Sequence, residues 1–158
     1  MVRTMRVAAI LMVVTLATAQ AHAAALSEAI LALAENILGR GTMISVRTTD
    51  DDGQALMRWE SATYRSSNTL PTTRHLVYGE AELATGSIMG RLPQIVRVRF
   101  TIMRKNTMLA TGENWRGRGV TMVFSSQLGG GLLKPGDFVP DSTRQRNRQQ
   151  GGDAAEEI

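Results

Sequence analysis

The sequence predicts an α+β domain in which one N-terminal amphipathic helix packs on a curved antiparallel sheet of five or six strands. Two observations predict this fold. Apolar residues recur at helical spacing early in the chain, and residues 43–126 contain short runs rich in β-branched residues, separated by glycine or polar breaks. The chain has no cysteine, so a hydrophobic core must stabilise the domain without disulfides.

The first 23 residues have the features of a cleaved secretory signal peptide. Two arginines precede an almost unbroken apolar run over residues 7–19, and Ala21 and Ala23 are small residues at the positions that signal peptidases require. A membrane anchor is the alternative, but a spanning helix needs about 20 apolar residues and this run is shorter. We expect a periplasmic or secreted mature protein that begins at Ala24 and has no transmembrane segment.

The mature chain is expected to form a single domain over residues 24–140. Three glycines at positions 129–131, followed by Pro135 and Pro140, interrupt regular structure at its end. The polar segment 141–158 has no core-forming residue before the last position, so we expect it to be disordered.

The expected helix covers residues 25–38. Ser27 is suited to cap its start and Gly39 to end it, because glycine readily adopts the left-handed conformation that closes a helix. The apolar positions that share one face of this helix are Leu26, Ile30, Leu33, Ala34 and Ile37.

Strands are expected at residues 43–49, 55–64, 76–84, 95–104, 108–112 and 120–124. Asp52-Gly53 is a strong hairpin signal between the first two runs, and residues 66–74, which include Pro71, are expected to form a loop. The 55–64 run also has the spacing of a short helix, although its composition favours a strand.

The run over residues 95–104 alternates apolar and polar side chains, which is typical of a sheet that is covered on one face only. One set is Val96, Val98, Phe100 and Ile102, and the other is Arg97, Arg99 and Thr101.

Net charge limits the choice of partner only weakly. The formal charge of +4 falls to +2 once the two signal-peptide arginines are removed, while residues 40–118 hold twelve basic and seven acidic side chains. This excess suits either a polyanion or, more simply, a solvated sheet face. Export argues against nucleic acid as the partner.

If the protein is an enzyme, Glu80 and Glu82 are its candidate catalytic residues. Two positions apart on a strand, their carboxylates share a face at a separation compatible with glycosidic acid-base chemistry. The favoured interpretation is an ion-pair ladder with Arg97 and Arg99 of a neighbouring strand. His75 is the single histidine of the mature chain, and it lacks the sequence context of a catalytic triad.

Residues 114–119 combine an aromatic ring with arginines in a glycine-rich setting. Trp115, Arg116 and Arg118 are therefore the first candidates for ligand or partner binding, followed by Trp59 and Tyr64. We expect no metal site and no cofactor, because the acidic run at 50–52 does not align with a calcium loop and no phosphate-binding glycine motif is present.

These features predict a non-enzymatic accessory or binding protein of the cell envelope. The expected partner is an envelope protein or a lipid, recognised through the sheet face or the Trp115 loop. Two alternatives remain open. Six methionines beyond the signal peptide permit a carrier with an apolar cavity between helix and sheet, and the paired carboxylates permit an exported hydrolase.

Overall fold

The computed structural model describes residues 3–49 and 53–137, and it confirms the α+β class. The expected disordered tail at 141–158 lies outside the described residues. In chain order the elements are α1 (Arg3–Leu38), β1 (Met43–Thr49), β2 (Gln54–Glu60), α2 (Leu70–Arg91), β3 (Arg97–Arg104), β4 (Thr107–Trp115), β5 (Gly119–Phe124), a short 3₁₀ helix (Ser126–Leu128) and β6 (Leu132–Leu133).

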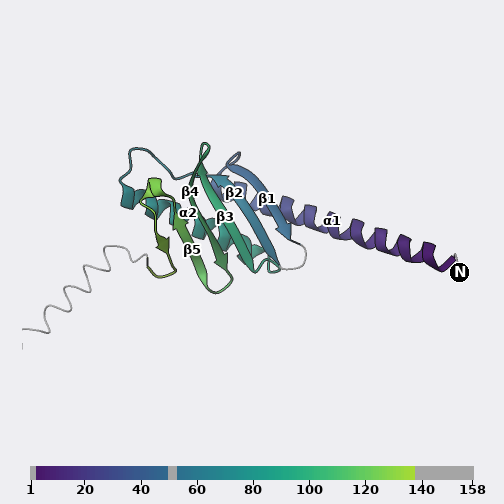
Figure 1. The fold of residues 1–158 in the computed structure, drawn as a ribbon. Helices are drawn as coiled ribbons and strands as arrows, with labels where there is room; N and C mark the ends of the chain where they lie inside the picture. The colour runs from purple at the N-terminus through teal and green to yellow at the C-terminus, as the bar shows by residue number, and fades with distance from the viewer. Residues whose placement is uncertain (1–2, 50–52, 138–158) are drawn as a thin grey trace, which may run out of the picture.

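The sheet has six strands, which lie side by side in the order in which they occur in the chain. Neighbouring strands are antiparallel except for β2 and β3, which are parallel. Parallel neighbours need a long crossover connection, and α2 supplies it. The sheet is therefore mixed: the β2–β3 pair is parallel, and all the remaining neighbouring pairs are antiparallel. Figure 1 shows both helices on the same side of this sheet.

A second helix, α2, is the main difference from the sequence prediction. The expected loop at 66–74 and strand at 76–84 are wrong, because α2 begins at Leu70 and continues to Arg91. Thr69 caps this helix by accepting a hydrogen bond from the Thr72 amide at 3.4 Å, and a proline lies in the first turn, where its missing N–H costs nothing. The buried apolar residues of α2 have helical spacing: Val77, Ala81, Ala84 and Ile88.

The C-terminal part of α1 packs as the sequence predicts. Ile30, Ala34 and Leu38 are buried on one stripe. The helix ends at Gly39, whose positive φ of 102° and amide hydrogen bond to the Glu35 carbonyl (3.0 Å) complete the C-terminal cap.

The start of α1 differs from the expectation. Helical structure begins at Arg3 and runs through Ser27 without a break, so this serine is not a cap. Its hydroxyl instead forms a hydrogen bond with the Thr48 hydroxyl of β1, at 3.1 Å. Figure 1 shows the first part of α1 projecting away from the sheet.

One stretch of the described chain, Ala21–Leu38 in α1, is long and apolar enough to cross a membrane by length and composition. Signal sequences and the core helices of soluble proteins meet the same criterion. From residue 21 onward, the first side chain that packs against the core is Leu26. The N-terminal helix is thus compatible with a signal sequence.

The core lies between the two helices and the covered face of the sheet. Trp59 is fully buried there, and its ring centroid lies 5.5 Å from that of Phe100. The strand interpretation of residues 55–64 is confirmed for the part that forms β2. The one-sided sheet is also confirmed, since Val98, Phe100 and Ile102 of β3 are buried while the intervening residues are not. Val96 does not belong to this buried set as expected, because it precedes the strand and is 40% exposed.

Candidate functional site

The face of the sheet opposite the helices is the candidate site. At its centre Arg99 of β3 lies in register between Leu56 of β2 and Glu113 of β4. One row further along, Thr101 lies between Arg58 and Thr111 in the same way. These side chains point away from both helices, because successive residues of a strand alternate between the two faces.

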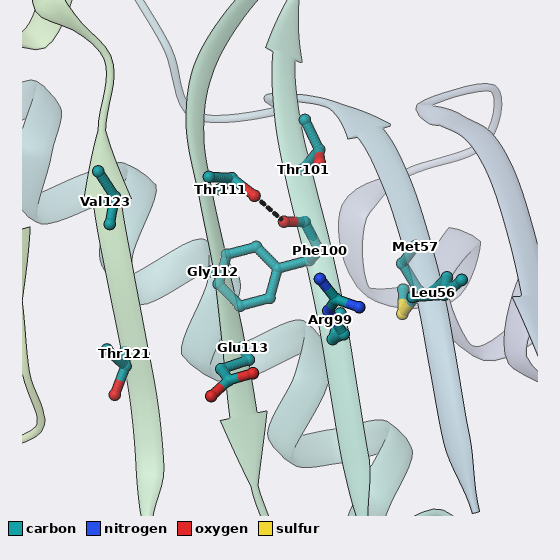
Figure 2. A pocket seen from close by; sticks show the side chains of 10 residues that line it. All are labelled: Leu56, Met57, Arg99, Phe100, Thr101, Thr111, Gly112, Glu113, Thr121 and Val123. Carbon is teal, nitrogen blue, oxygen red and sulfur yellow. Dashed lines mark hydrogen bonds between the residues drawn. The ribbon is translucent and has the colours of Figure 1, made fainter. Parts of the chain in front are cut away.

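A groove of about 560 Å³ crosses this face over β2, β3, β4 and β5 (Figure 2). Its two ends are apolar and open, since Leu56 is 37% exposed and Val123 is 45% exposed. Threonine hydroxyls lie between them, and the strand backbone forms the floor. The lining residues are Leu56, Met57, Arg99, Phe100, Thr101, Thr111, Gly112, Glu113, Thr121 and Val123.

Close packing makes the floor of the groove rigid. A Cβ atom at Gly112 would lie 2.3 Å from the carbonyl oxygen of Thr121 and 2.8 Å from the ring of Phe100, so only glycine fits between these strands. The Thr111 hydroxyl donates a hydrogen bond to the Phe100 carbonyl at 3.0 Å, drawn dashed in Figure 2. The groove is therefore a preformed feature of the sheet.

Glu113 is the acidic residue of the groove, and its charge is already compensated. Its Oε2 accepts hydrogen bonds from the Arg97 guanidinium, which also forms an ion pair with it, and its Oε1 accepts one from the Trp115 indole at 3.0 Å. The hydrogen bonds from Arg97 and then from Trp115 hold the pKa of this carboxyl below its usual range.

This arrangement leaves Arg99 without a hydrogen bond or ion pair in the described chain, although its charge adds, after the Arg97 and Trp115 hydrogen bonds, to the lowering of the Glu113 pKa. Its side chain is exposed and forms no hydrogen bond or ion pair with any residue in 3–49 or 53–137. Arg58 and Arg47 are exposed on the same face and likewise have no partner within the described chain. Arg47 and Arg99 are the cross-strand neighbours of Leu56, and Arg58 is two residues further along the same strand. The backbones of the three arginines therefore lie about 5 to 7 Å from that of Leu56.

The residues of the predicted Trp115 loop make different contacts. Trp115 is half-buried, with the Arg97 guanidinium carbon 4.5 Å and the Arg118 guanidinium carbon 5.8 Å from its ring centroid. Arg116 donates instead to backbone carbonyls at the C-terminal end of α2, where a cation is favoured. These acceptors belong to Met89, Leu92, Pro93 and Ile95.

The other two predicted binding residues lie elsewhere. Trp59 has no exposed surface and is level with Ile102 of β3, whereas Trp115 is level with Arg97 near the other end of that strand. Tyr64 is half-buried, with the Arg104 guanidinium 5.3 Å from its ring centroid. The five candidates therefore do not gather at one site.

Sequence reasoning missed several residues of the groove, among them Thr111, Thr121 and Val123, and it also missed Arg58 beside the groove. The alternation of β3 was available as a guide to the exposed face. Extending the same period of two to the adjacent strands would have identified most of the others.

Glu80 has a structural role in place of the expected ladder or catalytic pair. It lies on α2, is 5% exposed, and accepts five hydrogen bonds that tie this helix to the segment following β2. The donors are the Trp59 indole (2.7 Å), the Ser61 hydroxyl (2.8 Å), the Ala62 amide (3.1 Å), and the Thr63 amide (3.2 Å) and hydroxyl (2.6 Å).

Glu82 is exposed on the same helix. Residues two apart in a helix point in different directions, so the two carboxylates do not share a face. Both readings that placed them on a strand are wrong. Arg97 pairs with Glu113 instead, and Glu80 is fully engaged inside the fold.

Within the described ranges, no group of three or more acidic or histidine side chains is placed to hold a metal ion. His75 is exposed on α2 and not at the start of a strand. Four of the six methionines beyond the signal peptide are buried core residues: Met57, Met89, Met103 and Met122.

Comparison with protein-family models, with curated proteins and with solved structures finds no significant match.

Proposed function

We propose that this protein is an exported, non-enzymatic binding protein of the cell envelope, and that it recognises a macromolecular partner on the open face of its sheet. The groove over β2 to β5 is the observation that carries the proposal. It combines a closely packed floor, exposed apolar ends and a central cation, Arg99, that forms no hydrogen bond or ion pair with a described residue. A macromolecular partner can complement this surface by covering the apolar ends and placing an acidic group near the central cation.

Export is supported by the sequence and by where the core begins. Cleavage after Ala23 removes no residue of the described hydrophobic core, because Leu26 is the first side chain of that core. The expected mature protein therefore retains its buried stripe on α1. Intact-mass measurement of protein purified from its native host is expected to give a chain that starts at Ala24. A full-length chain in the membrane fraction would contradict cleavage.

Site-specific photocrosslinking tests the binding surface directly. A photoreactive amino acid at Thr111, in the middle of the groove, is expected to trap a discrete partner in living cells. The matched control is Leu83, which is 60% exposed on α2, on the opposite side of the molecule. Crosslinks from Thr111 without crosslinks from Leu83 support the proposal.

Equal crosslinking from both positions, or from Leu83 alone, would overturn the assignment of the open face. Absence of any crosslink from Thr111 and from a second groove position, Val123, would count against a macromolecular partner. Thr111, Val123 and Leu83 are all exposed, so the fold is expected to tolerate the photoreactive residue at each position.

A further inference from the structure

We infer that the groove binds an extended, acidic polypeptide segment of the partner, with Arg58 and Arg99 receiving its carboxylates. This inference rests on the proposed function and names the chemistry of the partner at the same surface. Three properties of this surface support it: the cations in and beside the groove, the hydroxyl groups of the groove, and its open shape with a single acidic lining residue.

The cations are the first property. Arg99 has a carboxylate directly across from it in the β3–β4 register, yet Glu113 is bonded to Arg97 and Trp115 instead. Arg99 and its neighbour Arg58 therefore present guanidinium groups that form no hydrogen bond or ion pair with a described residue, and Arg99 interacts with Glu113 only through its charge. A guanidinium binds a carboxylate through two parallel hydrogen bonds, which gives an acidic ligand both affinity and orientation.

The hydroxyl groups are the second property. Thr101 and Thr121 have side chains without hydrogen bonds to other described residues, and Thr111 uses its proton to bond the Phe100 carbonyl. A hydroxyl both donates and accepts, so these three groups, in two neighbouring rows of the sheet, suit a backbone that presents N–H and C=O groups in turn. Leu56 and Val123 at the two ends offer apolar contacts for side chains of such a segment.

The chemistry of the groove favours a polypeptide over a membrane surface. The groove is open along its length, so it admits an extended chain across the strands. Glu113 also lies within the groove, and although it is compensated by Arg97, it disfavours a densely charged phosphate surface. The volume of about 560 Å³ lies within the usual range for ligand sites.

Fluorescence anisotropy with the whole mature protein tests this inference. The probe is a labelled peptide in which two leucines are set among six glutamates, and the matched control peptide has glutamine at every glutamate. Competing probes are inorganic phosphate and vesicles of phosphatidylglycerol. The variants are Arg99→Gln, Arg58→Gln and, as a control with the same loss of charge, Arg91→Gln at the exposed end of α2.

The acidic peptide is expected to bind, with an affinity that falls as salt rises because the contact is electrostatic. Arg99→Gln and Arg58→Gln are each expected to weaken binding about tenfold, while Arg91→Gln changes it less than about twofold. The glutamine peptide is expected to bind at least about tenfold more weakly than the acidic one.

Equal weakening by all three variants would overturn the inference, because it would mean that only net charge matters. Binding of vesicles or phosphate in preference to the acidic peptide, lost in Arg99→Gln, would replace the peptide with a phosphate-bearing ligand. If the peptide does not bind but Thr111 still crosslinks a protein, the peptide chemistry is overturned and the proposed function stands.

Discussion

Glu113 lies directly opposite Arg99 in the register of β3 and β4, but its carboxylate is bonded to Arg97 and to the Trp115 indole. The diagonal pairing commits the hydrogen-bonding oxygens of Glu113 to Arg97 and Trp115, so Arg99 interacts with this carboxylate only through its charge. It also places Arg97 within 4.5 Å of the Trp115 ring centroid, which adds a cation–π contact. The exposed sheet face thereby keeps at its centre a guanidinium that forms no hydrogen bond or ion pair with a described residue.

Replacing Arg97 with glutamine is expected to raise the pKa of the Glu113 carboxyl towards its usual value. The native pKa is lowered first by the Arg97 hydrogen bond, so the folded state favours the charged form. This contribution to stability is present above the unfolded-state pKa and is lost as the pH falls through the lower folded-state pKa. Carbon-13 NMR titration of the Glu113 carboxyl measures the shift, and an unchanged pKa in Arg97→Gln would refute the assignment.

Replacing Glu80 with glutamine is expected to lower the free energy of unfolding by about 2–4 kcal/mol. Glutamine keeps one acceptor oxygen, but its amide nitrogen cannot accept, so the donors at the replaced oxygen lose their acceptor; at Oε2 these are the Ser61 hydroxyl and the Thr63 amide and hydroxyl. Urea denaturation measures the change. Glu82→Gln is the matched control on the same helix, and it is expected to stay within about 0.5 kcal/mol because Glu82 is exposed.

Gly112→Ala is expected to destabilise the protein by more than about 2 kcal/mol. The added methyl group would meet the Thr121 carbonyl and the Met122 Cα at 2.3 and 3.0 Å, and neither is the end of a flexible side chain. Thermal and urea unfolding give the magnitude. A variant as stable as the native protein would show that β4 and β5 are less closely packed than described.

Gly86→Ala is expected to have the opposite sign, with a gain of about 0.5–1 kcal/mol in the free energy of unfolding. Gly86 lies on the exposed side of α2, and an added Cβ would meet nothing within 4 Å. The substitution therefore reduces the entropy of the unfolded chain without a steric cost. A loss of stability on urea denaturation would argue against a helix at this position.

Local patterns in the sequence were enough to predict the stripe of α1 and most strands, because each depends on a short periodicity. The helix over 70–91 was missed although Thr69 and Pro71 give a helix-start signal. Gly79, Gly86 and Gly90 weaken the helical pattern, and a run of apolar residues at 76–78 resembles a strand. Once this segment was read as a strand, the sheet was expected to be wholly antiparallel.

The candidate site was predictable only in part. Alternation along β3 places Arg97 and Arg99 on the open face, as the structure confirms. Glu113 forms its ion pair with Arg97 and not with Arg99, which lies directly opposite. This pairing depends on side-chain geometry across strands, which no local pattern encodes. The burial of Glu80 depends on contacts with residues 17 to 21 positions earlier in the chain, and these follow from the packing of α2 against the end of β2.

Backbone amide NMR of the mature protein, titrated with the acidic peptide, tests the central claim most directly. The account predicts that the largest chemical-shift changes fall on groove residues such as Arg99, Thr111 and Thr121, while the exposed side of α2 around Leu83 stays unchanged. Largest changes on α2 or in the turn after Trp115, with the groove unaffected, would contradict the assignment of the open sheet face as the binding surface.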